Sequence, residues 1–67
     1  MNHKIETMLI REKALRMSSG QLADEIARCR RGIQVGANQA ARSRFERRLH
    51  IMQEEADARI AVAGGAR

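Results

Sequence analysis

The stretch that decides the fold is residues 38–62, which read NQAARSRFERRLHIMQEEADARIAV. Apolar side chains recur in it at steps of three and four residues, the spacing that lines one face of an α-helix. This stripe consists of Ala41, Phe45, Leu49, Met52, Ala56, Ile60 and Ala63. Asn38 can cap the start of the helix, and Gly64-Gly65 is expected to end it. We therefore predict a helix over about residues 38–62.

A second stripe with the same stepping lies upstream. Its members are Leu22, Ile26, Cys29 and Ile33, and Met8 and Leu15 fall on the same side. This pattern favours one helix over about residues 4–33. The segment Ser18-Ser19-Gly20 interrupts the pattern, and Ser18 followed three residues later by Gln21 is typical of a capping box, which starts a new helix. The first helix is thus expected to be continuous, with a kink or a break at residues 18–20 as the alternative.

Length favours continuity. The later helix would be about 37 Å long at 1.5 Å per residue, whereas residues 19–33 alone would span only about 22 Å. Something must cover the distal half of the later helix, including Ala56 and Ile60. Residues 4–17 do so if they continue the first helix.

The connection between the two stripes is short. It covers residues 34–38, in which Gly36 can adopt a positive φ at a helix end and Asn38 suits the next cap. Short connections join antiparallel neighbours. We predict an all-α, antiparallel two-helix hairpin that forms a single domain over residues 1–63, followed by a flexible tail at 64–67.

The chain is too short to rely on its own core. A core in a chain below about 70–80 residues rarely supplies more than about 3–5 kcal/mol. Cys29 is the only cysteine, so no disulfide can form within one chain. His3, Cys29 and His50 lack the spacing of a zinc site, and no cofactor motif occurs. Self-association remains, and we expect a homodimer or a higher oligomer.

Nothing in the sequence indicates a membrane or export. No apolar run approaches 18 residues, and no signal-peptide pattern is present. A lone cysteine without an export signal is typical of a reducing compartment. We expect a cytoplasmic protein, located in the host cytoplasm if a phage encodes it.

The charge is concentrated near the predicted turn. The chain carries a net charge of +5, whereas residues 28–48 hold seven arginines and one acid, Glu46, for a net charge of +6. Arg28, Arg30 and Arg31 would lie in the last turns of the first helix, where cations favour the negative end of the helix dipole. The dipole therefore accounts for these three.

Four further arginines would lie where the dipole disfavours cations, in the first turns of the second helix. An anion held by the amides of that helix N-terminus and by these guanidiniums would reverse the unfavourable charge. A merely solvated basic face is the alternative. The candidate ligand-binding residues are Arg31, Arg42, Arg44, Arg47 and Arg48.

A second apolar flank indicates a candidate interface. Ile51 and Val62 lie off the main stripe and share one side of the second helix. In a two-helix protein such a flank is expected to contact another chain, and Phe45 is the expected anchor of a packed protein interface.

Patterns typical of catalysis are missing. Ser18, Ser19 and Ser43 have no His–Asp partners at recognisable spacing, and no glycine-rich phosphate loop or metal motif occurs. A two-helix hairpin also offers little concavity for a reaction. We predict a binding protein and not an enzyme.

Two segments resemble a family of small phage helical-hairpin proteins that sequester the cyclic nucleotide signals of bacterial immunity. The matching residues are Ile10-Arg11-Glu12 in the first helix, and Leu49, Met52 and Ala56–Ala61 in the second. The resemblance covers the hairpin. It implies an oligomer that traps a nucleotide between protomers, and it assigns no individual binding residue.

Two functions from different classes follow. In the first, an oligomeric protein of phage or mobile-element type, with a possible counter-defence role, binds an anionic ligand, either a nucleotide or nucleic acid, through its arginine-rich end. In the alternative, the protein is an inhibitor or adaptor that docks an apolar flank on an acidic host protein. Salt should weaken phosphate-dominated binding steeply, whereas a packed protein interface should depend more on anchors such as Phe45 and Ile51.

Overall fold

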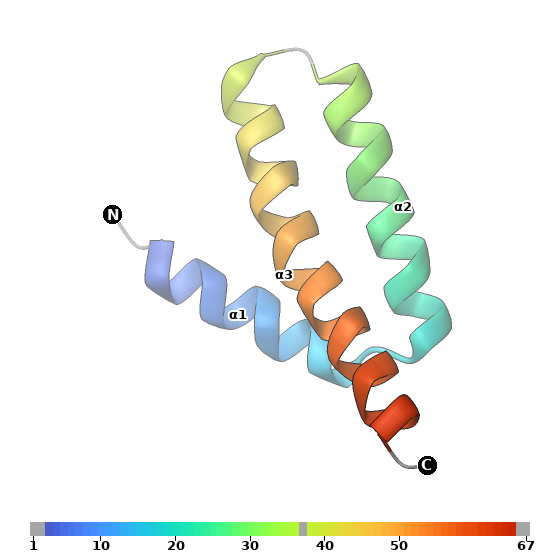
Figure 1. Cartoon of the computed structure of the whole chain (residues 1–67). Coiled ribbons are helices and arrows are strands. Elements are labelled where there is room, and N and C mark those ends of the chain that lie inside the picture. The colour runs from blue at the N-terminus through green and yellow to red at the C-terminus, as the bar shows by residue number, and fades with distance from the viewer. Residues whose placement is uncertain (1–2, 37, 66–67) are drawn as a thin grey trace.

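Three helices make up almost all of the described chain (Figure 1). The computed structural model describes residues 3–36 and 38–65. Helix α1 spans His3–Arg16, α2 spans Ser19–Val35 and α3 spans Gln39–Gly65. The described residues contain no strand. The all-α prediction is confirmed, but three separate helices replace the predicted two-helix hairpin.

The predicted continuity of the first helix is wrong, because the chain leaves the helix after Arg16 and starts a new one at Ser19. Ser18 has an extended backbone, and its Oγ accepts a hydrogen bond from the Gln21 amide at 3.1 Å. The Gln21 Oε1 in turn accepts from the Ser18 amide at 3.0 Å. This reciprocal pair satisfies two amides that would otherwise lack a partner at the helix start. Local capping therefore outweighs the continuous apolar pattern.

Helices α2 and α3 lie side by side and antiparallel (Figure 1). Asn38 caps α3 as predicted, since its Oδ1 accepts a hydrogen bond from the Ala41 amide at 2.8 Å. Gly36 follows α2 with a φ of −54°, so the expected positive φ is not used. The lack of a side chain at Gly36 instead leaves room for Arg42, because a Cβ at residue 36 would overlap the aliphatic part of the Arg42 side chain.

Helix α1 packs against α3 and does not extend α2 (Figure 1). Glu6 pairs with Arg47, and Arg11 pairs with Glu54 further along α3. Helix α1 therefore runs in the same general direction as α3. The first and second helices each pack mainly on α3, which is the central element of the fold.

The core is small and centres on α3. Met52 has no exposed surface and packs with Ala14 of α1 and with Leu22 and Ile26 of α2. The full set of buried apolar residues is Ala14, Leu22, Ile26, Cys29, Ile51 and Met52.

The distal part of α3 is covered only in part. Ala56 packs against the core, but Ile60 is 70% exposed. The reason is that α1 ends at Arg16, beside Arg59, so that the last turns of α3 extend beyond it (Figure 1). Helix α3 continues to Gly65, past the predicted end at about residue 62, so residues 64–65 of the predicted tail 64–67 belong to the helix. Residues 66–67 of that tail lie outside the described residues.

The molecule is flat. Its principal dimensions are 44 × 26 × 15 Å, and its radius of gyration is 12.9 Å. A compact domain of this length would have a radius of gyration of about 11 Å. None of the helices in residues 3–36 and 38–65 is long and apolar enough to cross a membrane.

One close approach between α2 and α3 depends on a glycine. A Cβ on Gly32 would lie 2.6–2.7 Å from three atoms of the Phe45 ring. Real carbon atoms do not approach so closely, so the ring packs directly on the α2 backbone. Gly20, also in α2, has nothing within 4 Å of an added Cβ.

We expect Gly32→Ala to destabilise the protein by up to about 2 kcal/mol. Alanine gains about 1 kcal/mol of helix propensity, but forcing the ring away should cost about 1–3 kcal/mol. Gly20→Ala is the matched control and should be neutral or stabilising. Urea unfolding followed by circular dichroism measures both, and a stabilising Gly32→Ala would contradict the close ring packing.

Candidate functional site

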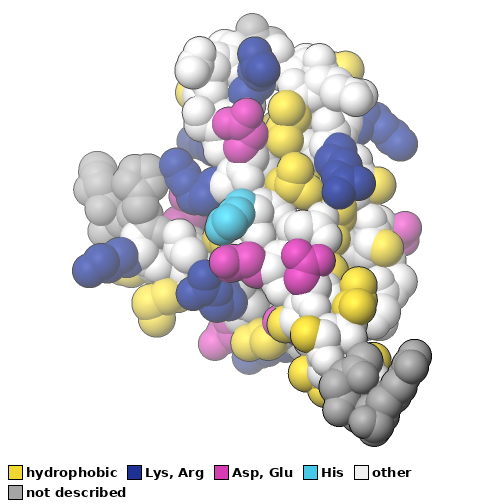
Figure 2. Space-filling model, in the orientation of Figure 1, with side chains coloured by type: hydrophobic (Ala, Val, Ile, Leu, Met, Phe, Trp, Pro, Cys, Tyr) yellow, Lys and Arg dark blue, Asp and Glu magenta, His cyan; other side chains and the backbone are white. Residues whose placement is uncertain are grey.

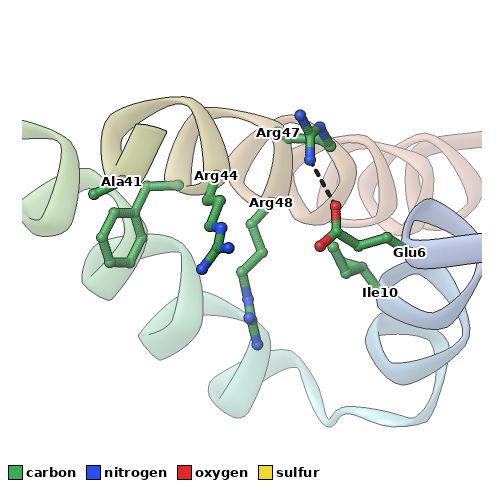
Figure 3. Close-up of a pocket in the computed structure, with 7 residues that line it drawn as sticks. Glu6, Ile10, Ala41, Arg44, Arg47 and Arg48 are labelled. Atoms are coloured by element: carbon green, nitrogen blue, oxygen red, sulfur yellow. Dashed lines mark hydrogen bonds and ion pairs between the residues drawn. The ribbon is translucent and has the colours of Figure 1, made fainter. Parts of the chain in front are cut away.

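An open groove of about 460 Å³ lies between α1 and the N-terminal half of α3. Two residues of α1 and five of α3 line it, namely Glu6, Ile10, Ala41, Arg44, Phe45, Arg47 and Arg48. We call it the arginine groove. Figure 3 shows that Arg44 and Arg48 extend from the same side of α3, whereas Arg47 turns toward Glu6.

Helical spacing explains this arrangement. The Asn38 cap fixes where α3 begins, and residues three or four positions apart then share a face. Arg44 and Arg48 are four apart and therefore project in the same direction. The acidic and His residues at 46, 50 and 57 are exposed on the opposite side of α3, where Figure 2 shows magenta and cyan side chains along the helix.

The charges in the groove are only partly balanced. Arg47 Nη1 lies 2.6 Å from Glu6 Oε1. Arg48 Nη2 lies 3.7 Å from Glu25 Oε2, and Glu25 is itself shared with Arg28. Arg44 pairs with no carboxylate among the described residues. Three guanidiniums and one carboxylate therefore line the groove, which gives it a net positive charge.

The structure brings together only some of the predicted ligand-binding residues. Arg44, Arg47 and Arg48 line the groove, whereas Arg42 and Arg31 are exposed outside it. The expected contribution of the helix N-terminus is also reduced, because the Ala41 amide already donates to Asn38. The groove, and not the start of α3, is where the positive charges converge.

The predicted interface residues have three different environments. Ile51 is only 4% exposed, because it lies on the face of α3 between the Arg47–Glu6 and Glu54–Arg11 pairs, where α1 packs. Helix α1 thus occupies the flank that was expected to face another chain. Val62 remains 74% exposed, and Phe45 is half-buried between Gly32 and the groove.

Arg59 holds α1 in the position that forms one wall of the groove. Its Nη2 donates to the carbonyl oxygens of Ala14 at 3.0 Å and Met17 at 2.8 Å, and its Nε pairs with Glu55 at 2.8 Å. The last carbonyls of a helix have no partner within the helix. One guanidinium on α3 therefore caps the C-terminal end of α1 and fixes it beside the start of α2.

Sequence reasoning missed Glu6, Ile10 and Arg59. The groove needs α1 beside α3, and no local pattern in residues 3–16 indicates that contact. The sequence contains one weak indication of a role for Arg59. It lies four residues after Glu55, and pairs of opposite charge at this spacing stabilise a helix. Its contacts with residues about 45 positions away had no local signature.

Cys29 is a packing residue. It is buried between α2 and α3, and burial raises the pKa of its thiol, although the nearby Arg48 acts in the opposite direction. A raised pKa keeps the thiol protonated near neutral pH, and the thiolate is the reactive form. The described residues also contain no group of three or more side chains suited to a metal ion.

Replacing Arg59 with alanine should release α1 from α3. Loss of hydrogen bonds from a charged donor to the α1 carbonyls should cost about 2 kcal/mol. Backbone amides of residues 3–16 should then exchange hydrogen faster, while those of α2 change less. Arg30→Ala is the control, because Arg30 makes a single exposed hydrogen bond to Gln53. Unchanged exchange in α1 of Arg59→Ala would contradict the role given to this side chain.

Comparison with known proteins adds no relative to this description. No protein-family model, no curated protein sequence and no solved structure matches the chain. The resemblance to phage proteins that sequester cyclic nucleotides therefore stays an expectation from the sequence. The geometry of the arginine groove is the basis on which we infer a function.

Proposed function

We propose that the protein binds a phosphate-bearing nucleotide in the arginine groove and holds it without converting it. The observation that carries the proposal is the convergence of Arg44 and Arg48, from the same side of α3, in a groove that also contains apolar surface. Arginine presents a planar fork of donors that matches phosphate oxygens in a bidentate way.

An anion would relieve an unfavourable arrangement. Like charges four residues apart on a helix destabilise it by a few tenths of a kcal/mol. Arg48 is partly compensated by Glu25 at 3.7 Å, but Arg44 has no such partner among the described residues. A phosphate between the two guanidiniums would replace this repulsion with two charge-assisted contacts.

The groove also suits the apolar part of a nucleotide. Ile10, Ala41 and the edge of Phe45 provide apolar surface beside the guanidiniums. The volume of about 460 Å³ lies within the range of roughly 300–1,000 Å³ that is usual for small-molecule sites. The size favours a mononucleotide or a cyclic dinucleotide over a long nucleic acid strand as the primary ligand.

The lining of the groove supports the proposal of binding without turnover. Among the groove residues, Glu6 is the one carboxylate, and its Oε1 is held by Arg47 at 2.6 Å. A general base must be able to reach and accept a proton from the substrate. An arginine guanidinium has five donors and no acceptor, so it does not serve as a base. Sequestration or delivery of the ligand is therefore the role that we propose.

The alternative of an adaptor for an acidic host protein has weaker support. That interpretation relied on a flank formed by Ile51 and Val62, of which Val62 is exposed but Ile51 is buried under α1. Three of the arginines near that flank, Arg44, Arg47 and Arg48, line the groove. We therefore place the nucleotide ahead of an acidic protein surface.

Alanine at Arg44 or Arg48 should weaken nucleotide binding about tenfold or more. Loss of a hydrogen bond to a charged group is worth about 1.5–3 kcal/mol, and each 1.4 kcal/mol changes an affinity tenfold. Isothermal titration calorimetry with ATP measures the effect. Arg42→Ala and Arg31→Ala are matched controls, because they remove the same side chain from the same basic region outside the groove.

Two further conditions sharpen the test. Binding should weaken as salt is raised, because the contacts are ionic and partly exposed. A single-stranded oligonucleotide titrated in parallel separates a small nucleotide from a longer ligand. No ATP binding at millimolar concentration, or equal losses in all four variants, would contradict a nucleotide site in this groove.

A further inference from the structure

Large apolar side chains remain exposed on the outer side of α1 and around the last turns of α3. We call this the apolar edge and define it by Ile5, Met8, Leu9, Leu15, Ile60 and Val62, each of which is 55–74% exposed. Figure 2 shows yellow side chains along the lower border of the molecule, from α1 to the end of α3. The two parts meet where Arg59 reaches the Leu15 carbonyl oxygen at 3.5 Å.

Both helices at this edge are apolar beyond the face that they bury. Helix α1 packs Ile10, Ala14 and Met17 inward and still carries four large apolar side chains on its outer side. The last turns of α3 read Ile60-Ala61-Val62-Ala63, and all four residues are exposed. Contiguous exposed apolar surface of this kind marks an interaction site.

The small core indicates what kind of surface is missing. Among the described residues only six apolar residues are buried, whereas the six large side chains of the apolar edge remain 55–74% exposed. Helices packed on the apolar edge would enlarge the core, and a second copy of the same chain supplies such helices with the same apolar edge.

The distribution of charge favours a second copy over a charged partner. No residue from 60 to 65 carries a charged side chain. Beside the apolar edge on α1, Glu12 pairs with Arg16 and Arg11 pairs with Glu54, while Lys4 adds one further positive charge near Met8. The apolar edge thus has few charges with which to select an acidic or basic surface. Residues 28–48, at the end where α2 finishes and α3 begins, carry +6 and would repel a second copy there. Two copies therefore meet best at their apolar edges, with the arginine ends apart.

The available area fits a weak dimer. A large side chain buries roughly 60–120 Å² on full burial, and these six are already partly buried, so they contribute roughly 250–450 Å² per copy. A standard interface buries about 800 Å² per partner. The six side chains therefore supply about half of a standard interface, and dimerisation should be weak and depend on protein concentration.

We propose that two copies of this chain associate through their apolar edges about a two-fold axis, so that α1 and the end of α3 of each copy pack against those of the other. Such an interface is self-complementary and closes at two copies. The two arginine grooves stay outside the interface, so association does not depend on the proposed nucleotide binding.

A pair of valines provides the test. Val62 lies in the apolar edge, and Val35 lies at the turn end of α2, with exposures of 74% and 73%. We expect sedimentation velocity, run from low micromolar to several hundred micromolar protein without nucleotide, to show a monomer–dimer equilibrium for the unaltered chain. Val62→Lys should raise the dimer dissociation constant at least about tenfold, whereas Val35→Lys should change it less than about twofold. Circular dichroism confirms that both variants fold.

Cross-linking gives an independent readout. In a Cys29→Ser background, Val62→Cys should form a disulfide-linked dimer under mild oxidation, and Val35→Cys should not. The proposal is overturned if the unaltered chain is monomeric at several hundred micromolar. It is also overturned if Val35→Lys weakens the dimer as much as Val62→Lys does, because association would then not depend on the apolar edge.

Discussion

The guanidinium of Arg59 makes the contacts on which the position of α1 depends. It donates to carbonyl oxygens at the end of α1, lies 3.5 Å from the Ser19 hydroxyl at the start of α2, and pairs with Glu55. A cation at the C-terminal end of a helix is favoured by the dipole of that helix. The same contact fixes the angle at which the chain turns from α1 into α2. Without α1 in that place, the arginine groove would lose Glu6 and Ile10 and become an open face of α3.

The sequence predicted the parts of the fold that local chemistry determines. The Asn38 cap, the helical face of α3 around Met52 and the stripe of Leu22, Ile26 and Cys29 all appear in the structure. The capping box at Ser18 was recognised but judged weaker than the apolar pattern, and this order was wrong. The placement of α1 could not be predicted, because it rests on side chains 41–45 residues apart, such as Glu6 and Arg47.

The prediction of the site was limited for the same reason, because the groove combines residues of α1 and α3 that are far apart in the sequence. Arg44, Arg47 and Arg48 were identified from their unfavourable position in the helix dipole, which is a local property, and they do lie together in the groove. Arg42 was chosen for the same reason but points elsewhere, because it lies two residues before Arg44, which corresponds to a rotation of about 200° around the helix. From the sequence, Ile51 was expected to lie on an exposed flank, because the sequence did not indicate that α1 packs there and buries it. The position of α1, which is distant from α3 in the sequence, determines which side of α3 lines the groove and which side is buried in the core.

Gly32 and Phe45 carry a consequence for sequence variation. None of the described residues adopts a positive φ, so the backbone itself does not demand glycine at any described position. The constraint at residue 32 is the volume of the ring that rests on it, 2.6 Å from where a Cβ would be. In homologous chains the two positions should therefore change together, with a larger residue at 32 accompanied by a smaller one at 45. Covariation of residues 32 and 45 would show that homologous chains keep the α2–α3 contact, even if their capping residues and arginines differ.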